Sequence, residues 1–193
     1  MRKFVFATNN NHKVDEVLEL LNNNFKIQTL NEIGCIEELP EEGDTLEFNA
    51  VQKAWYVYQK YDCNCFADDT GLEIEALNNE PGVYSARYAG PAKDAIANMD
   101  KVLEKLNKSE NRRAKFKTVI ALILDGKKYL FEGKVEGEIL KERKGLSGFG
   151  YDPIFKPNGF NETFAEMNLN LKNKISHRAN AINKLVTFLK TIQ

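Results

Sequence analysis

Short apolar runs that alternate with amphipathic stretches constrain the fold of this 193-residue chain more than any other feature. The run Lys3–Ala7 predicts a buried strand. After a polar loop, an apolar stripe from Val14 to Leu21 predicts a helix. Phe25–Leu30 then predicts a second strand. The first half of the chain therefore indicates a strand–helix–strand arrangement, which is typical of parallel pairing.

The second half of the chain carries the pattern of an antiparallel meander. Ala114–Leu124 predicts a long strand, and Asp125–Gly126 predicts the hairpin turn that ends it. Tyr129–Phe131 and Val135–Leu140 predict two returning strands. Together the two halves predict an α/β protein, in which helices pack on a mixed sheet.

Composition limits the partners and the cellular location that we expect. Hydrophobic residues make up 42% of the chain and charged residues 28%, which suits one globular domain spanning residues 1–193. The net charge of −1 argues against nucleic acid as a partner. Three cysteines and only two histidines disfavour structural zinc, and reduced thiols suit a cytoplasmic protein. The run Phe4–Ala7 is too short for a signal peptide, and no run is long enough to cross a membrane.

Two adjacent carboxylates follow the apolar run Cys65–Ala67, which predicts the end of a buried strand. Thr70 and Gly71 come next and predict a tight turn. On an extended chain Asp68 and Asp69 point to opposite sides, so we expect them to have different tasks. One would face a metal ion or water while the other holds a neighbouring loop. The alternative is an ordinary junction between a strand and a turn.

The loop Thr8–Lys13 lies between a predicted strand and a predicted helix. This order directs backbone N–H groups and the positive end of a helix at an anion. Lys13 in the first helical turn opposes the helix dipole, and a bound phosphate would explain it. The loop lacks the glycines of a Walker motif. A simple asparagine cap explains the loop equally well.

The acidic run Glu37–Asp44 precedes a helix that Asp44–Glu47 opens with capping-box spacing. On that helix Asn49 and Lys53 share one face. A carboxylate from the run would join Asp69 around a divalent cation, since magnesium takes one or two protein carboxylates. The alternative is a solvated loop.

Two further segments suggest a ligand. In the glycine-rich loop Gly145–Pro153, Phe149 would stack on a nucleobase or else pack into the core. His177 and Arg178 follow Ser176, the predicted cap of the last helix, and basic groups in a first helical turn suggest a bound anion or acceptor. Arg87, between two tyrosines, would contact a phosphate or a partner, or would only stack on the surface.

Taken together, these clusters describe a magnesium–nucleoside triphosphate site for phosphoryl chemistry. At this point the chain resembles the inosine/xanthosine triphosphate pyrophosphatase family, which removes non-standard purine nucleotides. The resemblance covers nearly the whole chain, in family order. Its segments are Phe6–Lys13, Glu41–Ala50, Ala67–Leu72, Pro81–Gly90, Gly148–Phe155 and Ser176–Arg178.

The resemblance implies a long mixed sheet, two lobes with a central cleft, and a homodimer. It also implies hydrolysis of ITP, dITP or XTP to the monophosphate and pyrophosphate with Mg²⁺. Asp69 would activate water and, with Glu41, would bind the metal, and Asp68 would support that site; the residues alone leave open which aspartate accepts the proton. By the same resemblance, the phosphates would be held by Thr8, Asn10, Lys13 and Lys53, and the base pocket would be formed by Phe149, Tyr151, Asp152, Lys172, Ser176, His177 and Arg178. The other expected substrate-binding residues are Asn9, Asn11, His12, Thr70 and Gly150.

Three positions depart from the family pattern. Asn9 replaces a usual glycine, Glu42 stands where threonine is common, and Phe48 replaces a usual glutamate. Selection of the base would follow from donors at His177 and Arg178, which suit a 6-oxo acceptor and not a 6-amino group. This argument leaves rejection of guanosine unexplained. Two alternatives stay open: a pyrophosphatase for pyrimidine or modified nucleotides, and a nucleotide-binding protein without turnover.

Overall fold

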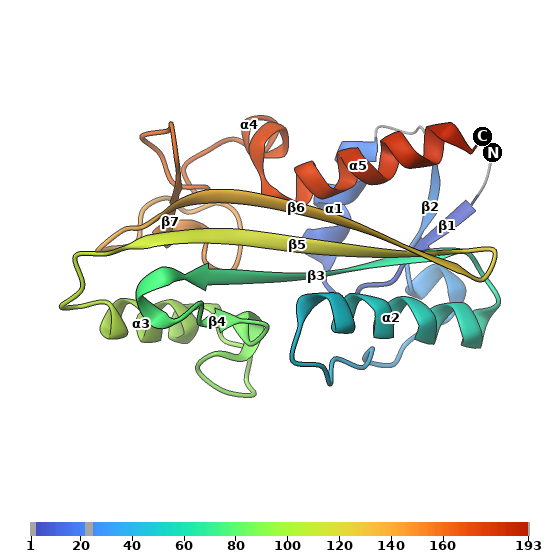
Figure 1. The fold of residues 1–193 in the computed structure, drawn as a ribbon, viewed down its shortest axis with the longest axis horizontal. Helices are drawn as coiled ribbons and strands as arrows, with labels where there is room; N and C mark the ends of the chain where they lie inside the picture. The colour runs from blue at the N-terminus through green and yellow to red at the C-terminus, as the bar shows by residue number, and fades with distance from the viewer. Residues whose placement is uncertain (1–2, 22–24, 193) are drawn as a thin grey trace. The chain divides into compact units, whose positions relative to one another are not determined.

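The computed structural model describes residues 3–21 and 25–192, and Figure 1 shows the order of the elements. The helices are α1 (Asn11–Leu21), α2 (Leu46–Tyr61), α3 (Ala95–Lys105), α4 (Leu169–Ile175) and α5 (His177–Thr191). The strands are β1 (Lys3–Phe6), β2 (Lys26–Gln28), β3 (Cys65–Ile74), β4 (Pro81–Gly82), β5 (Arg113–Leu124), β6 (Lys127–Ile139) and β7 (Phe155–Pro157). Met1 and Arg2 of the predicted single domain lie outside the described residues.

The sheet is mixed, as the sequence predicts. Within the described residues it has seven strands in the order β2-β1-β3-β5-β6-β7, with β4 paired to β3. β1 runs parallel to β2 and to β3, whereas β4 and β7 pair antiparallel with β3 and β6. The predicted α/β class with helices flanking a mixed sheet is confirmed.

The chain divides into two compact units. Unit 1 comprises Met1–Asp69, Thr118–Gly133 and Arg178–Gln193, and unit 2 comprises Thr70–Lys117 and Lys134–His177. The chain therefore crosses between the units four times, at Asp69–Thr70, Lys117–Thr118, Gly133–Lys134 and His177–Arg178. The first and the last of these crossings fall inside segments that the sequence marks as functional.

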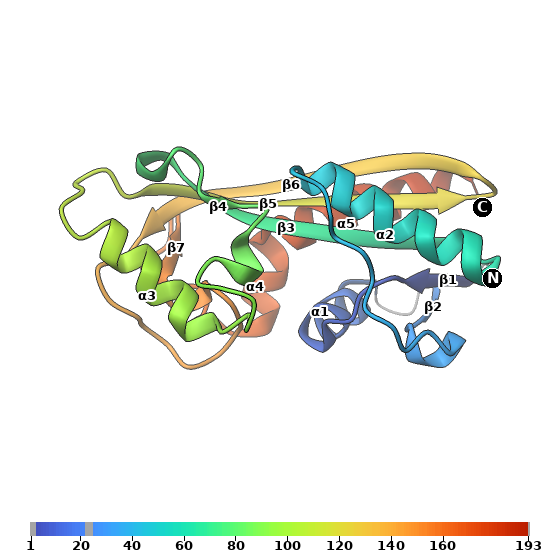
Figure 2. The ribbon, with the colours of Figure 1, turned by 90° about the horizontal axis from the view of Figure 1, so that it is seen from below.

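In unit 1, helices cover both faces of the sheet. Val17 of α1 and Ile182 of α5 are buried in one cluster with Phe4, Phe6 and Phe66 of β1 and β3. Figures 1 and 2 show α2 on the opposite face from α5. Helix α2 begins after Thr45, whose hydroxyl accepts from the Phe48 amide at 3.1 Å. The predicted capping box is therefore wrong, because the cap is Thr45 and not Asp44, and the residue three positions after it, Phe48, has no carboxylate to complete a box.

Unit 2 has its own apolar core, formed by β-strands together with α3 and α4. Phe116 of β5 lies at its centre, against Phe155 and Phe164. Helix α3 contributes Met99 and Val102. The helix also supports the segment Pro81–Gly90. The buried Asn98 amide donates to Ala86 O at 3.0 Å and accepts from Ala89 N at 2.6 Å.

The predicted turn at Thr70–Gly71 is wrong, because these residues lie inside the continuous strand β3. Pairing explains the difference. Val5 and Phe6 of β1 pair with Cys65 and Phe66, and Leu72 pairs with Gly82 of β4. Both ends of the segment are thus held in extended backbone, and this overrides the local turn preference of Thr-Gly. The expectation that Asp68 and Asp69 point to opposite sides survives, since it requires only an extended chain.

Three smaller differences follow from tertiary packing. Tyr129–Phe131 and Val135–Leu140 belong mainly to the single strand β6 and are not two strands. Leu18, which lies within the predicted stripe from Val14 to Leu21, is 46% exposed. Helix α4 is not predicted from the sequence, because its seven residues are too few to show a clear period. In the described part of the chain, no helix combines the length and apolar character needed to cross a membrane.

The acidic run of unit 1 begins at a hub around Glu37. The Glu37 carboxylate accepts from Lys60 at 2.5 Å, from Tyr56 at 3.1 Å and from Tyr61 at 2.9 Å. These donors, with Lys60 first, lower the pKa of Glu37 from 4.5 to about 2. The hub fastens the run to α2.

The hub predicts a pH-dependent stability. Because the Glu37 pKa is lower in the folded than in the unfolded chain, the carboxylate stabilises the fold above pH 4.5, and this contribution is lost as pH falls toward about 2. Glu37→Gln should lower the melting temperature at pH 7, and the difference from the native protein should shrink at pH 3. Thermal unfolding at both pH values, with the exposed Glu104→Gln as control, measures it. A difference that stays constant with pH would contradict this account.

Candidate functional site

Asp68 of β3 lies in the interior of unit 1 between two cations. Its Oδ1 accepts from Lys13 Nζ at 3.0 Å, and its Oδ2 accepts from Arg178 Nη2 at 3.2 Å and Nε at 3.3 Å. Burial by itself would raise the pKa of Asp68, but Lys13 and Arg178 hold it well below its usual range. Asp68 is therefore a permanently ionised anchor and a poor proton acceptor.

Arg178 is 2% exposed and pairs with two buried carboxylates. Besides Asp68, its guanidinium donates to Glu16 of α1. The structure thus gives Arg178 a different set of neighbours from the expected base pocket. The Arg178 guanidinium therefore holds the Asp68 carboxylate in place, and Asp68 in turn holds the Lys13 ammonium.

Asp69 points to the other side of β3 and has separate partners. Its Oδ2 accepts from Asn49 Nδ2 at 3.1 Å, and its Oδ1 lies 3.8 Å from Lys53 Nζ. Burial raises the pKa of Asp69, although Lys53 and Lys13 oppose this effect. Of the two aspartates, Asp69 is therefore the better proton acceptor.

Lys53 of α2 connects Asp69 to the acidic run. Its ammonium contacts Glu41 as well as Asp69, and Lys53 is only 5% exposed. Burial alone would lower the pKa of Lys53, but the carboxylates of Asp69 and Glu41 outweigh it and raise the pKa. Since both carboxylates reach one nitrogen, their oxygens converge on the same small volume.

Amide side chains hold the acidic run in place. Asn49 accepts from Gly43 N at 2.8 Å while it donates to Asp69. A Cβ on Gly43 would lie 2.9 Å from the Asn49 oxygen and 2.2 Å from the Phe48 ring, so the close approach requires glycine. Asn9 donates to Glu37 O and accepts from Leu39 N, both at 3.2 Å.

The first loop is built as a helix start. Asn10 accepts from Lys13 N at 3.3 Å through its side chain, and Thr8 accepts from Asn10 N at 3.2 Å. Asn11 and His12 are exposed at the beginning of α1. The loop therefore has the asparagine cap that the sequence offered as one interpretation. The cap leaves the predicted phosphate role untested.

In unit 2 the glycine-rich loop is closed by Asp152. Its buried Oδ2 accepts from Phe149 N at 2.9 Å and from Lys172 Nζ at 2.7 Å. Gly148 has φ +74°, and a Cβ there would lie 2.2 Å from the same oxygen. Lys172 Nζ also lies 5.0 Å from the centre of the Phe149 ring. Gly150 adds a second positive φ of 62°. The loop is thus preorganised around a half-buried aromatic ring.

Tyr151 connects this loop to the segment Pro81–Gly90. Its hydroxyl donates to Ser85 O at 2.8 Å. The Ser85 hydroxyl donates to Gly82 O at 2.6 Å and accepts from Leu72 N at 2.9 Å, just beyond the half-buried Thr70. This segment therefore acts as a support for the loop.

The remaining predicted residues of unit 2 stand at the junction of α4 and α5. His177 is buried and stacks on Phe116, with ring centres 4.6 Å apart and planes at 15°. Ser176 is 2% exposed and lies between the two helices.

The sequence left open whether Arg87 contacts a ligand or only stacks on the surface. In the structure its guanidinium lies over the Tyr84 ring, 5.2 Å from the ring centre.

Twelve of the predicted site residues fall into two clusters. The carboxylate cluster of unit 1 consists of Lys13, Glu41, Lys53, Asp68, Asp69 and Arg178, together with Glu16, and the aromatic cluster of unit 2 consists of Phe149, Gly150, Tyr151, Asp152, Lys172 and His177.

Sequence reasoning missed Glu16 as a member of the carboxylate cluster and did not assign Asn49 a role. Glu16 had a weak signal, since it lies three residues after Lys13 and beside Val17 of the buried stripe.

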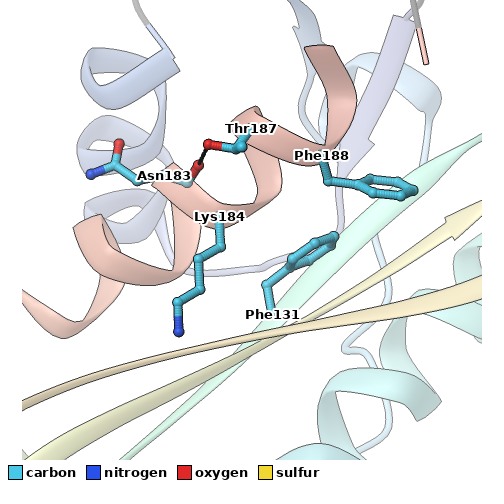
Figure 3. A pocket seen from close by; sticks show the side chains of 5 residues that line it. All are labelled: Phe131, Asn183, Lys184, Thr187 and Phe188. Carbon is cyan, nitrogen blue, oxygen red and sulfur yellow. Dashed lines mark hydrogen bonds between the residues drawn. The ribbon is translucent and has the colours of Figure 1, made fainter. Parts of the chain in front are cut away.

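The pocket in Figure 3 is separate from both clusters, in that none of the predicted site residues line it. It is lined by Phe131, Asn183, Lys184, Thr187 and Phe188. Lys184 donates to Glu132 O at 2.6 Å, and Thr187 donates to Asn183 O at 2.8 Å. The pocket brings together no acid–base pair.

Known proteins match the chain over nearly its full length. The Ham1 family matches residues 4–188. The chain is 54% identical over 187 residues to the dITP/XTP pyrophosphatase of Flavobacterium johnsoniae, with 97% of each covered. It is 44% identical over 194 residues to the dITP/XTP pyrophosphatase of Bacillus subtilis, with 98% of each covered.

Solved structures agree with these sequence matches. The Staphylococcus aureus Ham1 protein has a TM-score of 0.90 and 39% identity, with 100% of each chain covered. A HAM1 protein from Coxiella burnetii has a TM-score of 0.91 and 38% identity, with 99% of this chain and 100% of the other covered. The resemblance drawn from the separate motifs is therefore confirmed, and this chain belongs to the Ham1 family.

Proposed function

We propose that this chain hydrolyses non-canonical purine nucleoside triphosphates, namely ITP, dITP and XTP, to the monophosphate and pyrophosphate, and so clears them from the nucleotide pool. The observation that carries the proposal is the geometry of two adjacent buried aspartates. Asp68 is paired with Lys13 and Arg178, whereas Asp69 and Glu41 both approach the Lys53 ammonium. The dITP/XTP pyrophosphatases reported above support the substrate class.

Asp69 is the residue that we assign to accept a proton from the attacking water. Its raised pKa makes it a better base than Asp68, and Asn49 fixes its orientation. The water oxygen then forms a bond to the α-phosphorus, the bond from the α-phosphorus to the bridging oxygen breaks, and pyrophosphate leaves with the bonding electrons. The buried Lys53 and the half-buried Lys13 are cations suited to phosphate oxygens, and Thr8 and Asn10 stand beside Lys13.

Glu41 and Asp69 fit a magnesium ion, because their carboxylates converge on one ammonium. Among the described residues no group of three or more histidine, cysteine or acidic side chains is arranged to hold a metal. Two carboxylates suit a hard cation that keeps water and phosphate oxygens as its other ligands. When bound, such an ion would neutralise charge on the phosphates.

The aromatic cluster is suited to a purine base. Phe149 offers a ring face beside Lys172, and Asp152 fixes both. His177 provides a donor for the 6-oxo group of hypoxanthine or xanthine. A site built around such a donor disfavours adenine, because an unpaired buried polar group costs ~1–3 kcal/mol.

Both units belong, in this proposal, to one catalytic domain, since the chain crosses between them inside the motifs at Asp69–Thr70 and His177–Arg178. From the family resemblance we also infer a homodimer and a cytoplasmic location. Gel filtration with light scattering tests the dimer directly.

Asp69→Asn tests the assigned base. The variant should lose about 10²–10⁴-fold in kcat, the usual contribution of a positioned base, while it keeps its fold because asparagine still accepts from Asn49. Pyrophosphate release from ITP measures the loss, circular dichroism checks the fold, and the exposed Asp62→Asn is the control. Near-normal turnover would remove Asp69 from the role.

His177→Ala tests base selection. Loss of the imidazole donor should lower the ratio of kcat/KM for ITP to kcat/KM for ATP by about tenfold, which corresponds to ~1.4 kcal/mol. Phe116→Leu is the matched control, because it disturbs the stacked pair of rings and keeps the imidazole. An unchanged ratio in His177→Ala, or an equal change in both variants, would exclude His177 as a reader of the base.

Arg178→Met tests the buried ion network. Removing the guanidinium leaves Glu16 and Asp68 in the interior without their shared partner, so the free energy of unfolding should fall by about 3–5 kcal/mol. Urea unfolding measures this change, and the exposed Lys190→Met should change it little. A loss as small as that of the control would show that the network does not stabilise the fold.

A further inference from the structure

Lys53 occupies an unusual position for a lysine that would bind phosphate. Its ammonium contacts Glu41 and lies 3.8 Å from Asp69 Oδ1. These are the same two carboxylates that fit a divalent cation. Lys13, the other lysine of the carboxylate cluster, pairs instead with Asp68 at 3.0 Å. The two lysines therefore differ in which carboxylates they neutralise.

We propose that Lys53 competes with the divalent cation for Glu41 and Asp69, so that the enzyme binds the cation tightly only together with a nucleotide whose phosphates take over the Lys53 ammonium. This inference rests on the proposed function for its metal and its nucleotide. It adds an order of events: free cation binds weakly, and the cation–nucleotide complex binds well.

The charges of the cluster support this competition. Four carboxylates, those of Glu16, Glu41, Asp68 and Asp69, face three cations, the buried Lys53 and Arg178 and the half-buried Lys13. The cluster is therefore nearly neutral already. A divalent ion brought alone beside Lys53 would meet strong repulsion, because charges are poorly screened away from water. Phosphates that arrive with the ion supply the missing negative charge and new acceptors for the ammonium.

The carboxylates have supports that do not depend on Lys53. Asn49 holds the second oxygen of Asp69 at 3.1 Å and the Gly43 amide at 2.8 Å, two residues after Glu41. Gln52 accepts from Glu42 N at 3.1 Å and donates to the Glu42 carboxylate at 2.9 Å. When the ammonium leaves, the loop and Asp69 are still fastened to α2. Exchange of one cation for the other then requires only a side-chain movement.

The experiment measures Mn²⁺ binding to the nucleotide-free protein by the loss of the free-ion signal in electron paramagnetic resonance. Lys53→Met should bind Mn²⁺ about tenfold or more tightly than the native protein, equivalent to ~1.4 kcal/mol. Lys13→Met, which removes a cation from the same cluster but leaves the contacts of Glu41, should show a much smaller gain. Adding Glu41→Gln to Lys53→Met should abolish the gain, which locates the ion.

The proposed competition would be overturned if a folded Lys53→Met variant bound Mn²⁺ no more tightly than the native protein. It would also be overturned if Lys13→Met gained as much Mn²⁺ affinity as Lys53→Met. If Lys53→Met does not fold, Lys53→Gln, which removes the charge and keeps a polar group, is read in the same way. Hydrolysis of ITP by the native protein is measured separately. If the native protein does not hydrolyse ITP but Lys53→Met binds Mn²⁺ more tightly, the proposed substrate is rejected and the competition between Lys53 and the cation stands. If the native protein hydrolyses ITP but Lys53→Met binds Mn²⁺ no more tightly, only the competition is rejected.

Discussion

Neighbouring side chains of an extended strand point to opposite faces, and in β3 this rule separates Asp68 from Asp69. Each aspartate is buried, so each needs partners of its own. Lys13 and Arg178 neutralise Asp68. Asp69 instead accepts a hydrogen bond from Asn49 and lies close to the Lys53 ammonium. Two adjacent residues of the same type thereby acquire opposite pKa shifts and different roles. The helices of unit 1 carry the side chains that make this possible.

The supports around each cluster follow a common pattern, in which side chains fix backbone that has no regular structure. Asn9 holds the acidic run through two contacts, and Asn49 ties Gly43 of the run to Asp69. Asp152 closes the glycine-rich loop in the same way. Tyr151 and Ser85 extend the second support to β3. A site held within small tolerances needs such supports, because loops by themselves position side chains poorly. Several residues that resemble ligand contacts in the sequence therefore have a holding role in the structure.

Most of the fold and the family of the chain could be predicted from the sequence. Periodicity located the long elements, and motifs in order identified the family. The failures have physical causes. The turn at Thr70–Gly71 was predicted from local preference, which pairing with β1 and β4 overrides. Glu16 stayed hidden because its partner Arg178 lies 162 positions away in the chain, and no local pattern connects them.

The most direct test of the central claim is a substrate panel of ITP, XTP, dITP, GTP, ATP and dUTP with magnesium, in which pyrophosphate is resolved from orthophosphate. The account predicts fast release of pyrophosphate from ITP, XTP and dITP and slow release from ATP and dUTP. Orthophosphate as the first product would contradict the assigned bond, because attack would then fall on the terminal phosphate. Tight binding of the purine nucleotides without any release would contradict hydrolysis itself and would favour a nucleotide-binding protein.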